Sequence, residues 1–372
     1  MHLNRVFTDN FRNLNREEIY LHPGINIILG KNAQGKTNFL EAIYILAAAS
    51  SPRSAAEGEM VAWNNNYYFV QGEVNSREDN FSLSVGYSQG QKRIRLNDNP
   101  LERIRDLLGR LLIIFFGPED LQLIKGGPQI RRQFLNREIS LLQPLNYDYL
   151  QRYRSTLQQR NNLLKAIAEK KGNPADLEPW DEQLAAAGAE LITRRLWFLR
   201  EIGPLLSEHY RSISGEERRL EIKYDSRLPL DLKSSGEDWK RGFLSAWQRR
   251  RDEEIRRGFT LSGPHRDDIC FELEGRDLKI FGSQGQQRTA VLALKIAELK
   301  LMDSRRGEKP VLLLDDVFSE LDGNRQQALL QLMGSDQQTI ITTTDNNWQG
   351  LDKDCFYFTV EQGKIKRWEG RN

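Results

Sequence analysis

One stretch of this 372-residue chain decides its fold, Gly30-Lys31-Asn32-Ala33-Gln34-Gly35-Lys36-Thr37. It matches the pattern G-x-x-x-x-G-K-[ST] at every position, with an apolar run before it at 25–29 and a helical pattern after it at 36–49. The glycines let the backbone fold around a phosphate group so that successive N–H groups point inward, and the following helix start adds its positive dipole end. The stretch therefore predicts a phosphate-binding loop, or Walker A motif, for ATP.

The residues expected to handle Mg²⁺ and the attacking water come from two places in the chain. Lys36 should reach the β- and γ-phosphates, and the Thr37 hydroxyl should bind Mg²⁺. The apolar run 311–314 ends in Asp315 and Asp316, as a Walker B strand does. We expect Asp315 to hold a metal-bound water and Asp316 to orient or deprotonate the attacking water. A strand that ends in a solvated acidic turn is the plain alternative, and the complete Walker A motif argues against it.

A second phosphate-binding helix start is predicted at Ser283-Gln284-Gly285-Gln286, ahead of a helical pattern from Thr289. A hydroxyl, free N–H groups and a helix dipole together attract an anion. The segment resembles the signature motif of ABC-type ATPases, which meets the ATP held by the partner subunit. An ordinary helix cap has a similar sequence. The position of this segment ahead of the Walker B strand favours the signature motif.

Two further segments resemble parts of ABC-type heads. Ser319 and Asp322 follow the Walker B strand in a stretch similar to the D-loop, which lies across the dimer interface in that class. Thr344 follows the β-branched run 339–342, where such heads place a sensor of the γ-phosphate. A polar strand end explains Thr344 equally well.

The remaining patterns predict the architecture. Residues 67–96 alternate apolar and polar side chains, as antiparallel strands do. Apolar residues recur at helical spacing over 150–167 and 184–202, which predicts a helical hairpin with arms of roughly 30 to 35 Å. We therefore expect an α/β P-loop head of the ABC type, with antiparallel strands in its N-terminal lobe and a helical insertion.

These patterns predict that the chain has three parts. Residues 1–140 form the N-terminal part of the head with Walker A, 141–258 the helical insertion with its hairpin arm, and 259–372 the C-terminal part with signature, Walker B and D-loop. The insertion lacks a CxxC pair and is too short for the heptad arms and zinc hook or hinge of SMC and Rad50 proteins.

Composition excludes several other classes. No apolar run approaches the roughly 18 residues that span a bilayer, so no membrane association is expected. Two distant cysteines, Cys270 and Cys355, and four scattered histidines argue against a disulfide framework or a zinc site and fit a cytoplasmic protein. The net charge of +2 permits a local nucleic-acid surface but does not by itself predict one.

Motifs along the whole chain resemble the RecF family of bacterial recombination mediators. The segments that carry the resemblance are 10–14, 30–38, 127–135, 159–164, 262–268 and 314–322. The resemblance extends the nucleotide-binding stretch to Asn38 and implies that Arg12 lies near the nucleotide phosphates. Asn136 departs from the family pattern, which usually has Asp at this position.

The resemblance also implies a head similar to that of Rad50 and a function in DNA repair, recombination and the SOS response. Family members form homodimers on ATP, bind duplex DNA near single-strand gaps or junctions, and act with RecR and RecO to help load RecA. Slow, DNA-stimulated hydrolysis of ATP to ADP and phosphate releases them. A cytoplasmic, nucleoid-associated protein is implied as well.

Evidence for DNA contacts in the residues themselves is thinner. Residues 141–258 contain 22 Lys and Arg against 19 Asp and Glu, which is only a small excess. Pairs of arginines supply local positive charge and are the candidate DNA contacts: Arg131 and Arg132, Arg194 and Arg195, and Arg249 and Arg250. Solvated helix faces are the alternative for each pair.

Two other classes fit less well. An ABC transporter ATPase would have a second glycine in its signature, where this chain has Gln286, and commonly a switch histidine near Thr344. The segment His265-Arg266-Asp267 is similar to the catalytic loop of protein kinases, but no matching Asn follows it. The sequence assigns no role to the segment 265–268.

Overall fold

The computed structural model describes residues 1–53, 56–228, 236–332, 336–344 and 355–368. Two compact units make up the chain: the head unit, Met1–Leu121, Glu208–Glu217 and Gln284–Asn372, and the helical unit, Gln122–Ser207 and Arg218–Ser283. The division at 140 and 258 stays a prediction, and residue 140 lies inside the helix α3, Pro128–Leu142. Within the described ranges, no helix is long and apolar enough to cross a membrane.

The head unit contains a mostly parallel sheet with the strand order β15-β14-β3-β13-β12-β8. Its strands are β3 (Ile25–Leu29), β8 (Ile113–Phe116), β12 (Val311–Asp315), β13 (Thr339–Thr343), β14 (Cys355–Glu361) and β15 (Lys364–Arg367). All residues of β3, β12 and β13 are buried, as in parallel strands covered on both faces. The strands predicted at 311–314 and 339–342 are confirmed.

A second sheet in the same unit is antiparallel, in the order β2-β1-β4-β5-β6-β7. Its strands are β1 (His2–Asp9), β2 (Glu17–Tyr20), β4 (Tyr67–Asn75), β5 (Asn80–Ser88), β6 (Gln91–Leu96) and β7 (Asn99–Pro100). In β4 every second residue is buried, including Val70 and Val74, so the alternating pattern places one face on the core. The antiparallel strands predicted over 67–96 are confirmed.

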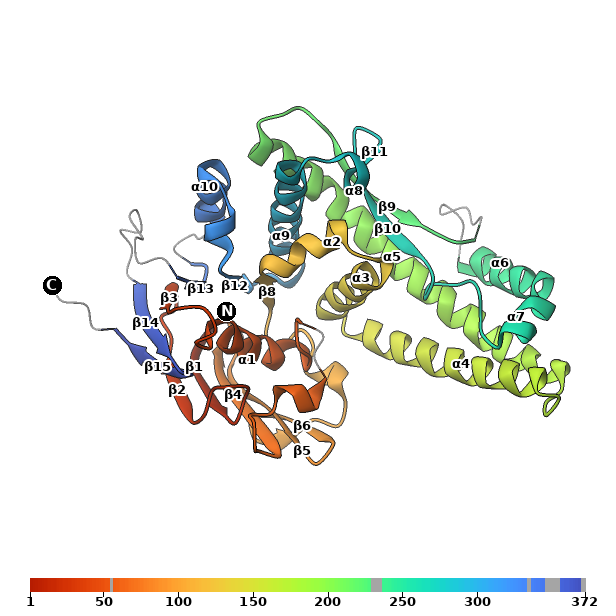
Figure 1. Ribbon diagram of the computed structural model, residues 1–372, viewed down its shortest axis with the longest axis horizontal. Helices are drawn as coiled ribbons and strands as arrows, with labels where there is room; N and C mark the ends of the chain where they lie inside the picture. The colour runs from red at the N-terminus through yellow and green to blue at the C-terminus, as the bar shows by residue number, and fades with distance from the viewer. Residues whose placement is uncertain (54–55, 229–235, 333–335, 345–354, 369–372) are drawn as a thin grey trace. The chain divides into compact units, whose positions relative to one another are not determined.

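Helix α1 (Lys36–Ala48) packs on strands of both sheets and forms the centre of the core (Figure 1). Almost all of its side chains are buried, from Phe39 to Ala48, which explains why its sequence is apolar on every side. The other elements of the unit are η1 (Glu57–Met60), η2 (Ile104–Asp106), η3 (Pro118–Leu121), α9 (Gln284–Arg306), η5 (Val317–Glu320) and α10 (Gly323–Leu332). The core therefore fixes α1 and, with it, the loop that precedes α1.

The helical unit is built on a long hairpin of α4 (Leu145–Ala168) and α5 (Leu177–Ser214), joined at η4 (Pro174–Asp176), which confirms the predicted hairpin; the end of α5, from Glu208, belongs to the head unit. Helix α5 is longer than expected because it continues through Pro204, which costs one backbone hydrogen bond while Ile202 and Leu206 stay buried beside it. The unit also holds α2 (Gln122–Lys125), α3 (Pro128–Leu142), α6 (Gly236–Arg249), α7 (Arg251–Arg257), α8 (Leu278–Phe281) and a sheet of β9 (Leu220–Asp225), β10 (Asp268–Leu273) and β11 (Arg276–Asp277).

The chain therefore has the predicted fold class: a P-loop α/β head with antiparallel strands in its N-terminal lobe and a helical insertion. The P-loop segment lies between β3 and α1, as the sequence predicts.

Candidate nucleotide-binding site

The loop between β3 and α1 needs glycine at two positions for different reasons. Gly35 has φ 117°, in the region that favours glycine, and a Cβ there would lie 2.9 Å from Oδ1 of Asn13. Gly30 has an ordinary backbone, but its Cβ would lie 2.7 Å from the carbonyl oxygen of Val360. The loop's curvature thus requires Gly35, and the close approach of the Val360 carbonyl requires Gly30.

Lys36 is the first residue of α1 and is buried, with only 5% of its surface exposed. Its Nζ donates to the carbonyl oxygens of Gly30 and Lys31, at 2.7 and 3.2 Å, so the ammonium group lies inside the curve of the loop. Burial lowers the pKa of Lys36, while Asp316 and Asp315 oppose that shift. The loop therefore holds a desolvated cation next to two carboxylates.

Asp315 ends β12 and is buried between two hydroxyl groups. Thr37 Oγ1 donates to its Oδ1 at 2.9 Å and Thr342 Oγ1 donates to the same oxygen at 2.7 Å. Burial raises the pKa of Asp315, and the hydrogen bonds from Thr342 and Thr37 act against that rise. The structure thus brings the predicted Walker A and Walker B residues into direct contact.

The sequence reasoning did not name Thr342, which contacts the Walker B carboxylate, and the role of Thr344 as a sensor of the γ-phosphate stays a prediction. Thr342 lies opposite Asp315 in the parallel pairing of β13 with β12, while Thr344 is exposed and follows β13. The alignment of two parallel strand ends was the available signal, since side chains at the carboxyl ends of neighbouring strands meet at one edge. Asp345, the residue after Thr344, lies outside the described residues.

Asp316 has an unusual backbone and a partly unsatisfied side chain. Its φ is 54°, and its N–H donates to the carbonyl and hydroxyl oxygens of Thr342 at 3.2 and 3.0 Å. Within the described part of the chain, its buried Oδ1 has no hydrogen-bond partner. A buried carboxylate oxygen without a partner is costly, and such groups occur where chemistry needs them.

These groups fit Mg²⁺. The ion prefers oxygen ligands and is usually held by one or two carboxylates, waters and the phosphates of a nucleotide. Thr37 Oγ1 and Asp315 Oδ1 lie 2.9 Å apart, and the unpartnered oxygen of Asp316 follows in the next residue. The described residues contain no cluster of three or more His, Cys, Asp or Glu that could hold an ion without a nucleotide.

A buried carboxylate that the sequence reasoning missed, Glu41 of α1, holds Arg12. The guanidinium of Arg12 donates to Oε2 and Oε1 of Glu41 at 3.1 and 2.9 Å, and Arg53 and Ser51 bind the same carboxylate. Burial favours a raised pKa for Glu41, but the hydrogen bonds from Arg12, Arg53 and Ser51 outweigh it and lower that pKa. Arg12 is therefore fixed to the helix that starts at the P-loop.

The apex of the P-loop is held from two sides. Asn13 Nδ2 donates to the carbonyl oxygen of Gln34 at 3.0 Å, and the Asn13 Oδ1 accepts from Asn38 Nδ2 at 2.8 Å. Two residues in the turn between β14 and β15 also bind Gln34. The Gly363 N–H donates to the Gln34 carbonyl at 2.8 Å, and the Gln362 N–H donates to the Gln34 side chain at 2.7 Å. The C-terminal hairpin thus helps to shape the loop.

The signature candidate lies at the start of α9. Ser283 is exposed and immediately precedes the helix, whose first residues are Gln284, Gly285 and Gln286. The Gly285 carbonyl accepts from Thr289 Oγ1 at 2.9 Å. The predicted helix from Thr289 is confirmed, but it starts five residues earlier, at Gln284.

The D-loop candidate follows Walker B in η5. Ser319 Oγ donates to the carbonyl of Asp316 at 2.7 Å, and Asp322 caps α10 by accepting from the Arg325 N–H at 3.1 Å. Both residues therefore stabilise the turn that leaves the Walker B strand.

The candidate DNA contacts differ sharply in their surroundings. Arg131 is buried and forms a two-pronged ion pair with Asp268, at 2.8 and 2.7 Å, and Arg132 donates to the Asp267 carbonyl at 2.9 Å. Arg195 is buried as well, and Arg194 is half-buried and donates to the Gln143 side chain.

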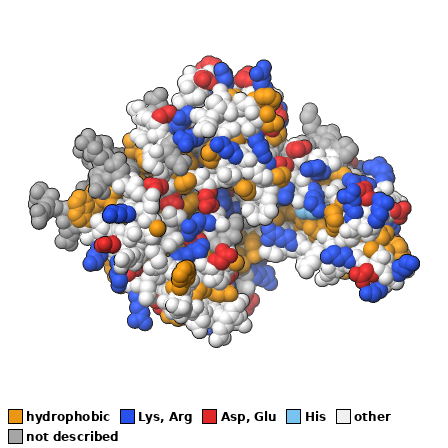
Figure 2. Space-filling view, viewed as in Figure 1, with side chains coloured by type: hydrophobic (Ala, Val, Ile, Leu, Met, Phe, Trp, Pro, Cys, Tyr) orange, Lys and Arg blue, Asp and Glu red, His pale blue; other side chains and the backbone are white. Residues whose placement is uncertain are grey.

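Only the third pair is exposed. Arg249 and Arg250 lie at the end of α6, and Arg250 pairs with Glu253 at 3.0 Å. Figure 2 shows blue Lys and Arg side chains mixed with red Asp and Glu side chains over the end of the helical unit that holds α6 and α7.

The segment 265–268 and Asn136 receive structural roles that the sequence did not assign. The Asp267 carboxylate accepts from Tyr224 at 2.8 Å, and the Pro264 carbonyl accepts from Arg195 at 2.8 Å. The same Arg195 donates to Asn136 Oδ1 at 3.1 Å. Residues 264–268 therefore tie together helices and strands of the helical unit.

The comparisons with known proteins agree with this geometry. The family profile described as RecF/RecN/SMC N terminal domain matches residues 2–366. "DNA replication and repair protein RecF" of Halothermothrix orenii is 42% identical over 349 residues, 93% of this chain and 92% of the relative. The protein of the same name from Halalkalibacterium halodurans is 38% identical and covers 99% of this chain and 100% of the relative. The chain belongs to the RecF family.

Solved structures of the RecF family have the same fold. One, described as "Structure of the recombination mediator protein RecF-ATP in RecFOR pathway", has a TM-score of 0.93, 35% identity and coverage of 99% of this chain and 97% of that chain. The head of an Smc protein bound to part of ScpA has a TM-score of 0.55 at 15% identity, over 99% of this chain and 97% of that one, and shows likeness of fold alone. The RecF resemblance found in the sequence is thus confirmed over nearly the whole length.

Proposed function

We propose that this chain is an ATP-dependent DNA-binding protein of recombinational repair. On ATP it forms a homodimer, binds duplex DNA near single-strand gaps, and with RecR and RecO helps to load RecA; slow hydrolysis of ATP releases it. The contact of Thr37 with Asp315 carries the proposal, because it joins a complete Walker A loop to a Walker B carboxylate. The names of the RecF relatives, which refer to DNA replication and repair, ATP and the RecFOR pathway, support it.

The residues of one head divide the work with ATP. Lys36 stabilises the charge of the β- and γ-phosphates from within the loop, and the loop N–H groups bind their oxygens. Thr37 and Asp315 would hold Mg²⁺, which would supply positive charge against the charge that develops on the phosphates. Asp316 orients the attacking water, or accepts a proton from it, through its unpartnered oxygen.

The second half of each catalytic site comes from the partner copy. Ser283 is exposed at the start of α9, where N–H groups without intrahelical partners and the helix dipole attract an anion. In the dimer this helix start binds the γ-phosphate held by the opposing Walker A loop. Hydrolysis therefore requires two heads, and ATP links the two copies.

DNA binding is assigned to exposed basic side chains of the dimer. A buried arginine with satisfied partners cannot reach a phosphate without breaking them, so the surroundings of Arg131 and Arg195 disfavour these two as DNA contacts. Arg249 and Arg250 remain the exposed candidates of the six. Binding through phosphates predicts an affinity that falls as salt rises.

Ser283→Arg tests the shared site. A large side chain at the helix start blocks the second head, so calorimetry should give a near-normal ATP affinity while light scattering shows no ATP-induced dimer. Hydrolysis and ATP-dependent binding to gapped duplex should fall with dimerisation. The matched control is Ser304→Arg, which is exposed at the other end of α9. If Ser283→Arg dimerises and hydrolyses ATP like the parent protein, the proposed mechanism is wrong.

A further inference from the structure

One arginine joins the signature helix to the D-loop. Arg325, in the first turn of α10, donates from Nη2 to the Gly285 carbonyl at 2.9 Å and from Nε to Thr289 Oγ1 at 2.9 Å. Its Nη1 forms an ion pair with the Asp322 carboxylate. All of these residues belong to the head unit, so a single guanidinium contacts the start of α9 and the end of the D-loop.

The D-loop is also tied to α10. Gln326 Nε2 donates to the carbonyls of Phe318 and Leu321, at 2.8 and 3.0 Å. Asp322 accepts from the backbone N–H of Arg325 at 3.1 Å, as a helix cap does. Hydrogen bonds thus hold the turn after Walker B against the first turn of α10, and Arg325 links both to α9.

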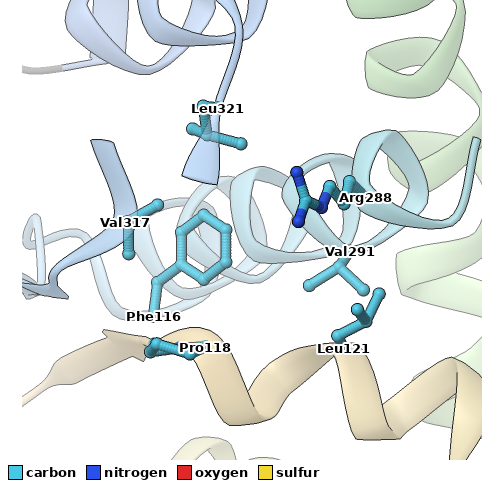
Figure 3. Close-up of a pocket in the computed structure, with 8 residues that line it drawn as sticks. Phe116, Pro118, Leu121, Arg288, Val291, Val317 and Leu321 are labelled. Atoms are coloured by element: carbon cyan, nitrogen blue, oxygen red, sulfur yellow. The ribbon is translucent and has the colours of Figure 1, made fainter. Parts of the chain in front are cut away.

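Direct apolar packing between these two elements is interrupted. A partly open pocket of about 30 Å³ is lined by Arg288 and Val291 of α9, by Val317 of η5 and Leu321 of the D-loop, and by residues 116–118 and 121 (Figure 3). Side chains that face a void lose contacts on that side. The placement of the D-loop against α9 therefore depends more heavily on polar contacts than it would across a filled interface.

We propose that Arg325 is a positioning residue that couples the D-loop to the signature helix, so that the two elements that complete the partner's site take up one arrangement together. The inference rests on the proposed function for its role in catalysis. A planar guanidinium has donors in fixed directions and reaches Gly285, Thr289 and Asp322 at once, whereas a lysine ammonium is a single point charge on a flexible stem. Arg325 therefore supplies hydrogen-bond donors in fixed directions as well as positive charge.

Hydrogen exchange tests the contact without nucleotide. In Arg325→Gln, amide exchange at residues 288–291, in the second turn of α9, should rise about tenfold, because a charge-assisted hydrogen bond to the first turn is lost. Asp322→Asn keeps the bonds to Gly285 and Thr289 and should leave exchange at 288–291 within about twofold of the parent. Arg306→Gln, which removes an arginine–carbonyl bond at the far end of α9, is the matched control. Unchanged exchange in Arg325→Gln would refute the coupling.

Kinetics test the role in the reaction. Arg325→Gln and Arg325→Lys should both bind ATP within about twofold of the parent, while kcat falls about tenfold, because Walker A is untouched and the partner's site is misplaced. A merely structural role would lower the melting temperature and leave kcat of the folded protein unchanged. Parental kcat in both variants overturns the inference. If the parent protein itself fails to bind ATP, the proposed function is refuted instead, and exchange at 288–291 still decides the contact.

Discussion

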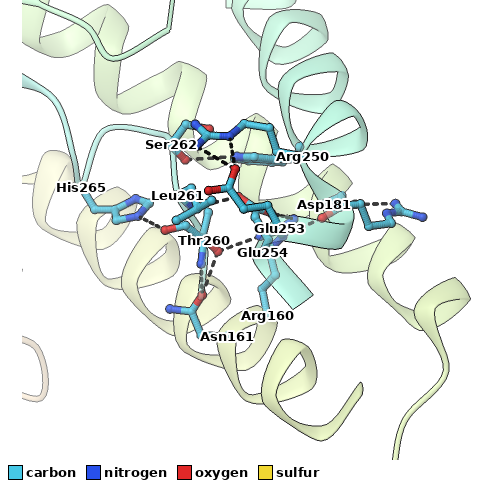
Figure 4. Close-up of polar contacts among 12 residues, drawn as sticks. Arg160, Asn161, Asp181, Arg250, Glu253, Glu254, Thr260, Leu261, Ser262 and His265 are labelled. Carbon is cyan, nitrogen blue, oxygen red and sulfur yellow. Dashed lines mark hydrogen bonds and ion pairs between the residues drawn. The ribbon is translucent and has the colours of Figure 1, made fainter. Parts of the chain in front are cut away.

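Both units of the chain bury charged side chains, but they treat them differently. In the head unit, Lys36 is held by backbone carbonyls alone, and Asp316 has a buried oxygen without a partner among the described residues. In the helical unit, Arg160 is fully buried and pairs with Asp181 at 2.6 Å and with Glu254 at 2.7 Å (Figure 4).

The network around Arg160 is dense. Its Nη1 donates to Thr260 Oγ1 at 2.7 Å, and its guanidinium lies over the ring of Trp247, 4.9 Å from the ring centre. Arg251 adds a second cation to Asp181 at 2.9 Å. The network links α4, α5, α6, α7 and the loop after α7, so it specifies how these elements pack.

The difference separates charges that act on a ligand from charges that hold the fold. A buried ion is costly unless ion pairs and hydrogen bonds compensate it, so a cluster in which each charged group is paired with an opposite charge serves packing. A buried ion with incomplete partners is kept because a ligand completes it. Variants at Lys36 and Asp316 should therefore change ATP chemistry with little effect on stability, and variants in the network around Arg160 should do the opposite.

The largest effect is expected from Lys36→Met. Removing the ammonium group leaves the β- and γ-phosphates without their main cation, so ATP affinity should fall by about a thousandfold or more, measured by calorimetry. Stability should be almost unchanged, because Lys36 contacts only two carbonyls. Lys309→Met, at a half-buried lysine paired with the exposed Asp336, is the control. Undiminished ATP affinity would contradict the assignment.

Asp316→Asn should lower the rate of hydrolysis about 10²- to 10³-fold while ATP and Mg²⁺ remain bound, because Asp315 and Thr37 are intact. The protein should then accumulate as an ATP-bound dimer in light scattering. A matched variant is Asp303→Asn, on α9 away from the Walker residues. Parental turnover in Asp316→Asn would place the catalytic group elsewhere.

Arg160→Met should break the network and spare the ATP site. It leaves Glu254 and Asp181 buried without their main cation, which costs about 3 to 5 kcal/mol of unfolding free energy by urea titration. Arg250→Met removes only an exposed pair with Glu253 and should cost less than about 1 kcal/mol. Equal losses of unfolding free energy in the two variants would contradict the structural role of the network around Arg160.

The smallest effect is expected in the dependence of folding stability on pH. Burial lowers the pKa of His265 from 6.5 to about 4, so the folded state binds fewer protons than the unfolded state between these values. His265 therefore contributes stability above pH 6.5 that is lost as the pH falls towards 4, about 3 kcal/mol in all. His265→Gln should flatten this part of the stability curve. His209→Gln, at a half-buried histidine whose pKa is also lowered, should flatten it less. A parental curve in His265→Gln would refute the assignment.

Much of the architecture could be predicted because it follows from local patterns. The alternation over 67–96 gave the antiparallel strands, and helical spacing gave the hairpin of α4 and α5. Helix ends were less accurate, as at α9 and at α5. Propensity marks Pro204 as a helix end, but buried residues on either side of it keep the helix intact.

The sequence by itself determined the P-loop, the Walker B carboxylates and the family, because each is encoded by neighbouring residues whose spacing is set by one loop or one strand. Only the tertiary structure decided that Thr342 places a second hydroxyl on Asp315, that Glu41 holds Arg12, and which arginines are buried. These pairs join residues far apart in the chain, and their contact depends on strand register and helix packing. The sequence of an arginine pair is the same whether its side chains face solvent or a buried carboxylate.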